Sequence, residues 1–274
     1  MIAKSHYPTG FLSQYVSSIW LLEAEAANHK RERTLPTGAI DLVFNLARED
    51  SQLYKGSNFD EVQTILGPVV CGAHTHPFGV DTTQSIKTLG IHFKPGGAAA
   101  FLGLPADELQ NQNIALQDLW GPRADALLDQ LRHEKTIEQR FALLDQTLRA
   151  GLDVSMHTDR LTRLAIPLME QAHSAIRIKT LADQFGLSQR QFYQIFRQNV
   201  GVTPKVFLRL QRFQKALKKL DAVSQNPDWA IFAAESDYYD QAHLIREFSA
   251  FTGLTPTQYQ AQKIHRSNHV PLPA

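Results

Sequence analysis

The second half of the chain repeats one pattern of 20 residues at an offset of 52 residues. Segment 188–207 is SQRQFYQIFRQNVGVTPKVF, and segment 240–259 is DQAHLIREFSAFTGLTPTQY. They align without a gap, and both contain the motif Phe-x4-Gly-[Val/Leu]-Thr-Pro, at Phe196 to Pro204 and at Phe248 to Pro256. An internal repeat indicates that one supersecondary unit occurs twice.

Each copy is typical of a capped helix that follows a shorter one. Ser188 and Asp240 suit the N-cap position, because their side-chain oxygens can accept hydrogen bonds from free helix N–H groups. Gly201 and Gly253 suit the left-handed conformation that ends a helix. A short helix, a tight turn and a capped helix form a helix-turn-helix unit. We therefore predict two such units, at about 178–199 and 230–251.

The side chains that face away from each predicted core are candidates for DNA contact. Helical periodicity turns Phe192 and Phe196 inward and leaves polar residues on the opposite face. Arginine and glutamine can form paired hydrogen bonds with the edges of guanine and adenine. The predicted DNA-binding residues are Ser188, Gln189, Arg190, Tyr193, Gln194 and Arg197 in the first unit, and Gln241, Ala242, His243 and Arg246 in the second. The second set is poorer in hydrogen-bond donors.

Residues 204–220 predict a long helix between the two units. Apolar residues share one face and six lysines and arginines occupy the others. We expect this helix to fix the distance between the two units, since neighbouring major-groove entries on one face of DNA lie about 34 Å apart. We also expect its basic side chains and the helix N-termini to contact phosphates.

Charge is distributed unevenly along the chain, although the net charge is only +1. Residues 175–220 contain ten Lys and Arg against one acid, whereas residues 221–274 contain three against six acids. Residues 1–155 carry a net charge of −5. A short basic block in a neutral chain is typical of a nucleic-acid-binding surface, and charge alone leaves a solvated helix face as an equal alternative. We expect the first unit to provide most of the attraction for phosphates.

The first half is predicted to contain strands followed by helices. Strands are expected at 40–46, 62–70 and 86–94, and helices at 98–102, 122–133 and 136–150, before a linker at 151–158. Cys71 is the single cysteine, which excludes an intrachain disulfide and a multi-cysteine zinc site. We read no signal peptide and no segment of about 20 apolar residues. A cytoplasmic protein without a membrane contact is expected.

The C-terminal half resembles the AraC/XylS family of bacterial transcription regulators. The residues that carry the resemblance lie between about Ile176 and Tyr259, with the most specific run at Tyr238–Phe248 and Gly253–Tyr259. Asp237 stands where the family usually has glycine, and Ala242 where serine is more usual. The segments Leu35–Asn45, Gly90–Ala98 and Leu116–Gly121 resemble, more weakly, the sensor region of some members.

This resemblance implies an α+β protein of several domains. Residues 1–155 would form a mixed β, cupin-like sensor domain with helices, and residues 156–266 an all-α domain with two helix-turn-helix units, followed by a tail at 267–274. The implied function is sequence-specific DNA binding in transcription regulation, controlled by the N-terminal domain, with no enzymatic activity and no cofactor. Double-stranded DNA is the implied partner. A small-molecule effector, RNA polymerase and a second copy of the chain are further candidates.

Two alternatives come from other functional classes. His74 and His76, with His92 nearby, could form a cupin-type metal cluster, so that a metal-binding enzyme would carry an accessory DNA-binding module. No glutamate follows these histidines at short range, and surface or turn histidines are the simpler interpretation. The acidic second unit also leaves open an interaction domain that does not bind DNA.

Overall fold

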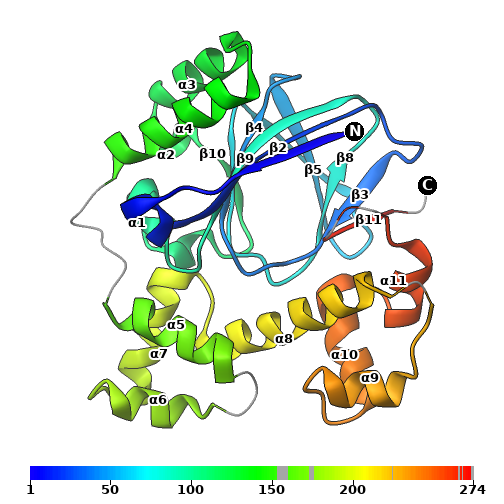
Figure 1. The fold of residues 1–274 in the computed structure, drawn as a ribbon. Coiled ribbons are helices and arrows are strands. Elements are labelled where there is room, and N and C mark those ends of the chain that lie inside the picture. Colours follow the sequence, from blue (N-terminus) through cyan, green and yellow to red (C-terminus); the bar gives the residue numbers. More distant parts are fainter. Residues whose placement is uncertain (153–159, 173–175, 224, 265, 267, 273–274) are drawn as a thin grey trace.

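Two antiparallel sheets face each other in the N-terminal domain, and a helical domain lies beneath them (Figure 1). The computed structural model describes residues 1–152, 160–172, 176–223, 225–264, 266 and 268–272. The six-stranded sheet has the order β1-β2-β9-β4-β7-β10, and the five-stranded sheet the order β11-β3-β8-β5-β6. The strands are β1 (Ile2–His6), β2 (Val16–Ala24), β3 (Arg31–Thr34), β4 (Asp41–Asn45), β5 (Asp50–Lys55), β6 (Glu61–Leu66), β7 (Val69–Cys71), β8 (Phe78–Asp81), β9 (Ile86–Phe93), β10 (Asn113–Ala115) and β11 (His269–Pro271).

The N-terminal domain has helices between and after its strands, and the C-terminal domain is helical. The first group comprises the 3-10 helices η1 (Gly10–Gln14) and η2 (Ala106–Leu109) and the helices α1 (Ala99–Leu102), α2 (Gln117–Trp120), α3 (Arg123–His133) and α4 (Ile137–Gly151). The second comprises α5 (Arg160–Ala172), α6 (Ile178–Gln184), α7 (Gln189–Val200), α8 (Pro204–Asp221), α9 (Trp229–Glu235), α10 (Gln241–Thr252) and α11 (Pro256–Gln262). The predicted α+β organisation and the helical C-terminal domain are confirmed.

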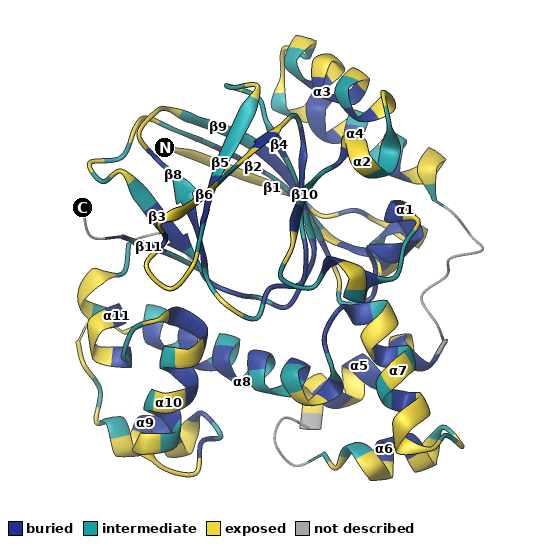
Figure 2. Cartoon of the chain, turned by 180° about the vertical axis from the view of Figure 1, so that it is seen from behind, coloured by how far each residue is buried: buried dark blue, intermediate teal, exposed yellow. Residues whose placement is uncertain are grey.

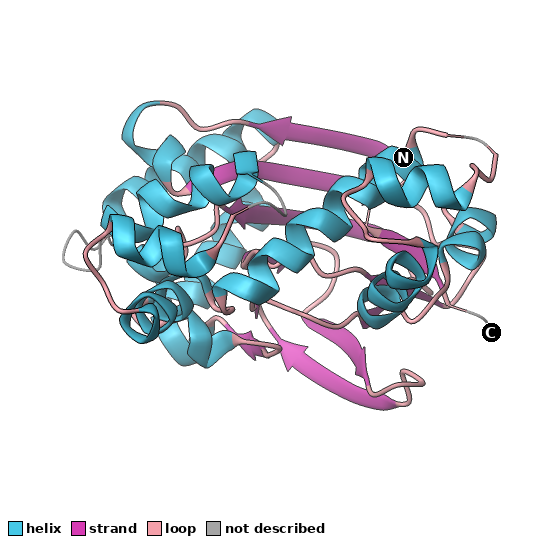
Figure 3. Ribbon diagram, turned by 90° about the horizontal axis from the view of Figure 1, so that it is seen from below, coloured by secondary structure: helices cyan, strands magenta, loops and turns pink. Residues whose placement is uncertain are grey.

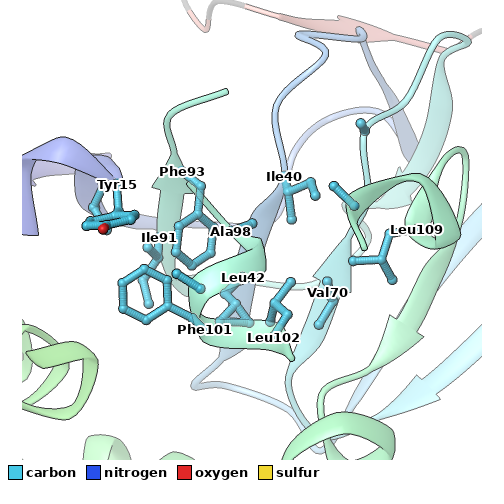
Figure 4. Close-up of a cluster of buried hydrophobic side chains, with 14 of the residues drawn as sticks. Tyr15, Ile40, Leu42, Val70, Ile91, Phe93, Ala98, Phe101, Leu102 and Leu109 are labelled. Carbon is cyan, nitrogen blue, oxygen red and sulfur yellow. The ribbon is translucent and has the colours of Figure 1, made fainter. Parts of the chain in front are cut away.

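The six-stranded sheet presents one face to the helices and the other to a cavity. Side chains alternate along a strand, so Ile19 and Leu21 of β2 enter the helix-covered core while Ser18 and Trp20 line the cavity. Figure 4 shows the core side, where Leu42, Val70 and Ile91 of the sheet lie beside Phe101 and Leu102 of α1. The burial of one whole sheet face accounts for the apolar residues at alternate positions of these strands.

The cavity between the two sheets has a volume of about 390 Å³, and side chains from neighbouring strands of the six-stranded sheet form rows along its wall. Ser18, His92, Asp41 and Cys71 are cross-strand neighbours and form a polar row. The Asp41 carboxylate lies 2.8 Å from His92 Nδ1, and its charge raises the pKa of His92 against the opposing effect of burial. The next row is apolar and consists of Trp20, Val43 and Val69. Gly90 lies between Trp20 and Val43 and leaves room for the indole ring. A Cβ at Gly90 would lie 2.2 Å from the Trp20 ring. The cavity therefore offers hydrogen-bonding groups beside an aromatic wall.

The end of the chain returns to the N-terminal domain. Strand β11 pairs antiparallel with β3 and forms an edge of the five-stranded sheet. The buried Glu32 carboxylate of β3 lies 2.8 Å from Arg266 Nη1 and 3.1 Å from His269 Nδ1. The predicted tail at 267–274 thus contains a strand that belongs to the five-stranded sheet of the N-terminal domain. Most of the predicted linker at 151–158 lies outside the described residues.

We expect Glu32 to make the stability of the chain depend on pH in the acidic range. Burial raises its pKa, but the hydrogen bond with His269 and the charge of Arg266 lower it from 4.5 to about 2. A lowered carboxyl pKa stabilises the fold above about pH 4.5, and this contribution is lost as the pH falls towards about 2. In urea unfolding, the stability difference between the wild type and Glu32→Gln should shrink by about 2 kcal/mol between pH 7 and pH 3. A difference that stays constant over this range would contradict the assignment.

Most predicted elements of the first half match observed ones. The strand expected at 86–94 is β9, and the helices expected at 122–133 and 136–150 are α3 and α4. The strand expected at 62–70 is divided into β6 and β7, because Gly67, with a φ of +72°, and Pro68 turn the chain between them. Among the described helices, none is both long and apolar enough to cross a bilayer.

Candidate DNA-binding surface

The first helix-turn-helix unit consists of α6, a turn and α7. Gly186 has a φ of +67° in the turn, and Ser188 then caps α7 by accepting a hydrogen bond from the Gln191 N–H at 3.3 Å. The Gln191 side chain in turn accepts from the Ser188 N–H at 3.0 Å, which completes a capping box. Phe192 and Phe196 are fully buried. The sequence prediction of this unit and its cap is confirmed.

The second unit repeats this arrangement with α9 and α10. The Asp240 side chain accepts from the His243 N–H at 2.6 Å, as expected for an N-cap. Asp237 has a φ of +62° in the turn, a conformation that favours glycine. Its carboxylate lies 2.7 Å from Lys215 Nζ of α8. This ion pair helps to hold an aspartate in a conformation that glycine adopts more easily.

The predicted DNA-binding side chains lie mostly on the surface. Both short helices, α6 and α9, lie on the side of the helical domain away from the sheets (Figure 1). The exposed members are Ser188, Gln189, Arg190, Gln194, Arg197, Gln241, Ala242 and Arg246, and the half-buried ones are Tyr193 and His243. Figure 2 shows exposed residues along these helices and buried ones where they pack together. The arrangement presents polar side chains near the N-terminus of each longer helix.

Besides the N-cap Ser188, two of the predicted contact residues already have partners within the chain. Arg197 Nε lies 3.1 Å from the Asp107 carboxylate of η2, in the N-terminal domain. The His243 ring accepts a hydrogen bond from the Tyr239 N–H at 3.3 Å and packs edge-on against Tyr238. Periodicity identified the exposed face of each helix but gave no information about these tertiary contacts. We therefore rank Arg190, Gln189 and Gln194 above Arg197 as base-contacting candidates.

The basic side chains of α8 mostly pair with acids of the second unit. Arg209 and Arg212 both contact the buried Glu247 of α10, the second at 3.4 Å. Lys219 Nζ lies 3.8 Å from the Glu235 carboxylate. The prediction that this helix attracts phosphates through its lysines and arginines is revised, because these pairs, with that of Lys215, already neutralise part of the charge. Lys205 and Lys218 remain exposed.

Tyr239 is a further candidate that the sequence argument missed. It directly precedes the N-cap of α10, and its side chain is 92% exposed. An aromatic residue beside another in a turn suggests core packing, and its neighbour Tyr238 is indeed buried. The equivalent position in the first copy is Leu187, so the repeat gave no signal. An exposed aromatic ring next to a recognition helix can contact sugars or thymine methyl groups.

The three histidines of the alternative metal site each have other contacts. His74 and His76 lie between β7 and β8, not on a strand as the metal hypothesis needs. His74 Nε2 lies 3.0 Å from Asn113 Oδ1, and burial lowers the pKa of His74 to about 4. Within the described residues, no three His, Cys, Asp or Glu side chains are grouped as metal ligands would be. Burial, and the nearby charge of Asp41, raise the pKa of the Cys71 thiol, as expected for an unreactive cysteine.

Comparisons with known families match the N-terminal domain and the helical domain separately. Residues 181–262 match a helix-turn-helix domain family, and residues 4–115 match a domain of unknown function, DUF6597. An uncharacterized HTH-type transcriptional regulator from Haemophilus influenzae is 31% identical over 121 residues. The match covers 44% of this chain and 40% of that protein, so the chain spans about two fifths of that relative's length.

Solved structures of ToxT from Vibrio cholerae resemble the whole fold. The structure bound to (E)-4-(8-methylnaphthalen-1-yl)but-3-enoic acid has a TM-score of 0.50 at 8% identity and covers 89% of this chain and 98% of ToxT. A 1.65 Å structure of ToxT has a TM-score of 0.49 at 9% identity, with the same coverage. At this identity the likeness concerns the fold alone. The chain thus contains a helix-turn-helix domain at residues 181–262 that follows a DUF6597 domain at residues 4–115, and its C-terminal half resembles the AraC/XylS family.

Proposed function

We propose that the chain is a sequence-specific DNA-binding transcription regulator. The observation that carries this proposal is the duplicated unit, in which two capped helices present exposed Arg and Gln side chains at the two ends of α8. Helix α8 has 18 residues and is therefore roughly 27 Å long. Figure 3 shows it crossing beneath the strands of the N-terminal domain. This length supports the placement of α7 and α10 in successive major-groove segments on one face of DNA, about 34 Å apart.

Selection of bound duplexes from a random DNA pool tests this function. We expect one enriched sequence with two half-sites about 10 base pairs apart, because α7 and α10 would enter the groove one helical turn apart. The affinity for this DNA should fall steeply with rising salt, as phosphate contacts release counterions. If no sequence is enriched, and if the weak residual affinity for DNA does not change with salt concentration, a domain that does not bind DNA is favoured.

We further infer that the cavity of the N-terminal domain holds a small-molecule effector. Its volume of about 390 Å³, its aromatic wall at Trp20 and its polar row around Asp41 support this role. Concave sites with a mostly apolar wall and a few fixed polar groups are typical of ligand pockets. An N-terminal regulatory domain of this kind would control the affinity of the helical domain for DNA.

Filling the cavity should remove the effector response and leave DNA binding intact. Compounds that raise the melting temperature would first be identified by a thermal-shift screen of small aromatic and aliphatic molecules. Val43→Phe places a ring in the cavity, whereas Val62→Phe adds the same bulk on the exposed outer side of β6, where Val62 is 57% exposed. We expect the first variant to lose the thermal shift and the second to keep it. Equal shifts in both would place the ligand elsewhere.

A further inference from the structure

The two helix-turn-helix units are attached to the N-terminal domain in different ways. Phe192 and Phe196 of the first unit, and Phe207 in the first turn of α8, belong to the same continuous apolar core as the six-stranded sheet and its helices. The second unit has a core of its own around Phe248, to which Leu35, just after β3, contributes from the N-terminal domain. The first unit is therefore fixed by a shared core. The second unit depends on α8 and on the contacts around Leu35.

Arg33 of β3 contacts the end of the second recognition helix. Its guanidinium donates a hydrogen bond to the carbonyl oxygen of Thr252, the last residue of α10. Arg33 is only 7% exposed and lies 5.1 Å from the centre of the Phe59 ring. Within the described part of the chain no carboxylate pairs with it, and burial lowers its pKa. A buried cation at a helix C-terminus interacts favourably with the free carbonyl groups and the helix dipole.

Neighbouring residues of the same segment contact two other elements of the second unit. Strand β11, which follows α11, pairs with β3 in the register Val270 to Arg33, and Glu32 holds Arg266 and His269. From α8, Gln214 Nε2 donates to the Pro36 carbonyl at 2.9 Å and to Asn268 Oδ1 at 2.8 Å. Residues 32–36 therefore touch α8, α10 and the segment after α11. We call these five residues the β3 clamp.

The equivalent end of the first recognition helix is also held by the N-terminal domain. Gly201 ends α7, and a Cβ at that position would lie 2.8 Å from Ala73 Cβ and 3.0 Å from the Ala106 carbonyl oxygen. Gly253, its partner in the repeat, would bring a Cβ to 3.2 Å from the Arg33 guanidinium. Both recognition helices are thus held at their C-terminal ends, while their N-terminal ends, with Gln189 and Gln241, stay exposed.

We propose that the β3 clamp fixes the second recognition helix relative to the first, and that Arg33 is the residue that positions α10. The proposal rests on the proposed function, because it assumes that both helices bind one DNA molecule. Two linked binding modules gain affinity only when their geometry allows both to bind at once. A second attachment beside α8 restricts the second unit to one placement, and therefore to one spacing of the half-sites.

The dependence of affinity on half-site spacing tests this positioning role. Duplexes would carry the two selected half-sites with the spacer changed in steps of one base pair. The wild type should show one narrow optimum. For Arg33→Gln we expect about ten-fold weaker binding at the optimum, a flatter profile over the neighbouring spacings, and less than about two-fold change on the first half-site alone. Arg33→Lys, which keeps the charge, should restore part of the optimum.

Arg31 provides the matched control on the same strand. Its guanidinium donates to the Phe59 carbonyl at 3.1 Å and lies over the Tyr54 ring, both within the N-terminal domain. Arg31→Gln should therefore keep the wild-type spacing profile. A profile for Arg33→Gln that matches the wild type would overturn the proposal, and so would equal flattening in both variants, which would indicate general loosening of the strand.

A distance measurement tests the clamp without DNA. Spin labels on Glu61→Cys in β6 and Thr257→Cys in α11, both exposed positions, in a Cys71→Ala background report the separation of the N-terminal domain and the second unit. We expect one narrow distance distribution for the wild-type clamp and a broad one for Arg33→Gln. If Arg33→Gln fails to fold, Glu32→Gln is expected to broaden the distribution in the same way. Unchanged distributions in the folded variants would refute the clamp, whereas failure to select any DNA would refute the proposed function alone.

Discussion

Replacing Arg190 and Gln194 together with alanine should weaken binding to the selected DNA by about 2–5 kcal/mol, with most of the loss in base preference. Both side chains are exposed on α7, and within the described residues neither takes part in an ion pair. A bidentate contact to one base contributes about 1–3 kcal/mol of discrimination. Gel-shift titrations against the selected site and against single-base variants would measure the loss at each position.

The equivalent pair in the second unit provides a comparison. Gln241→Ala with Arg246→Ala should cost less, because Ala242 and the internally bonded His243 leave this face with fewer donors. Gln198→Ala is the control, since it is exposed at the C-terminal end of α7, near the Arg197–Asp107 pair. If all three variants lost affinity equally and kept the same base preference, α7 would contribute phosphate contacts and no base readout.

Phe248→Ala should destabilise the second unit by about 3–5 kcal/mol, the usual cost of removing a fully buried ring. The Phe248 ring is 0% exposed, and its centre lies 5.4 Å from that of Phe213 and 5.6 Å from that of Tyr259. Because the two units belong to different cores, hydrogen exchange should rise in α9 and α10 while α7 stays protected. Chemical denaturation and amide exchange together measure both effects.

Ile231→Ala on α9 is the matched control for this loss. Its side chain is 60% exposed, so the free energy of unfolding should change by no more than about 0.5 kcal/mol. DNA binding by Phe248→Ala should fall to the affinity of the first unit for its half-site. Loss of exchange protection throughout the chain would show instead that the two cores unfold as one.

The repeat was sufficient to predict the two helix-turn-helix units and the long helix between them. The caps at Ser188 and Asp240, and the left-handed glycines at 201 and 253, are local features set by nearby backbone and side-chain chemistry. Helical periodicity also predicted which phenylalanines are buried. Asp237 shows the limit of this argument. Its positive φ could be anticipated from the family pattern, but its partner Lys215 lies 22 positions earlier on another helix.

Part of the uneven charge along the chain is used in ion pairs within the helical domain. The sequence showed a basic segment followed by an acidic one, and predicted stronger phosphate attraction in the first unit. In the fold, Glu235, Asp237 and Glu247 of the acidic segment face the basic side chains of α8. Part of the charge difference therefore stabilises the helical domain internally. Net charge per segment cannot distinguish paired from unpaired groups, because pairing depends on packing.

By itself, the sequence determined the elements with short-range causes: the two helix-turn-helix units, their caps, the long helix between them and the strands of the first half. The tertiary structure alone decided how these parts are joined. Arg33 and Thr252 are separated by 219 positions, and Glu32 and Arg266 by 234, so no periodicity connects them. Such contacts join elements that lie far apart in the sequence and side by side in the packed fold. For this reason the β3 clamp, the pairing of Arg197 and the cavity could be found only in the folded chain.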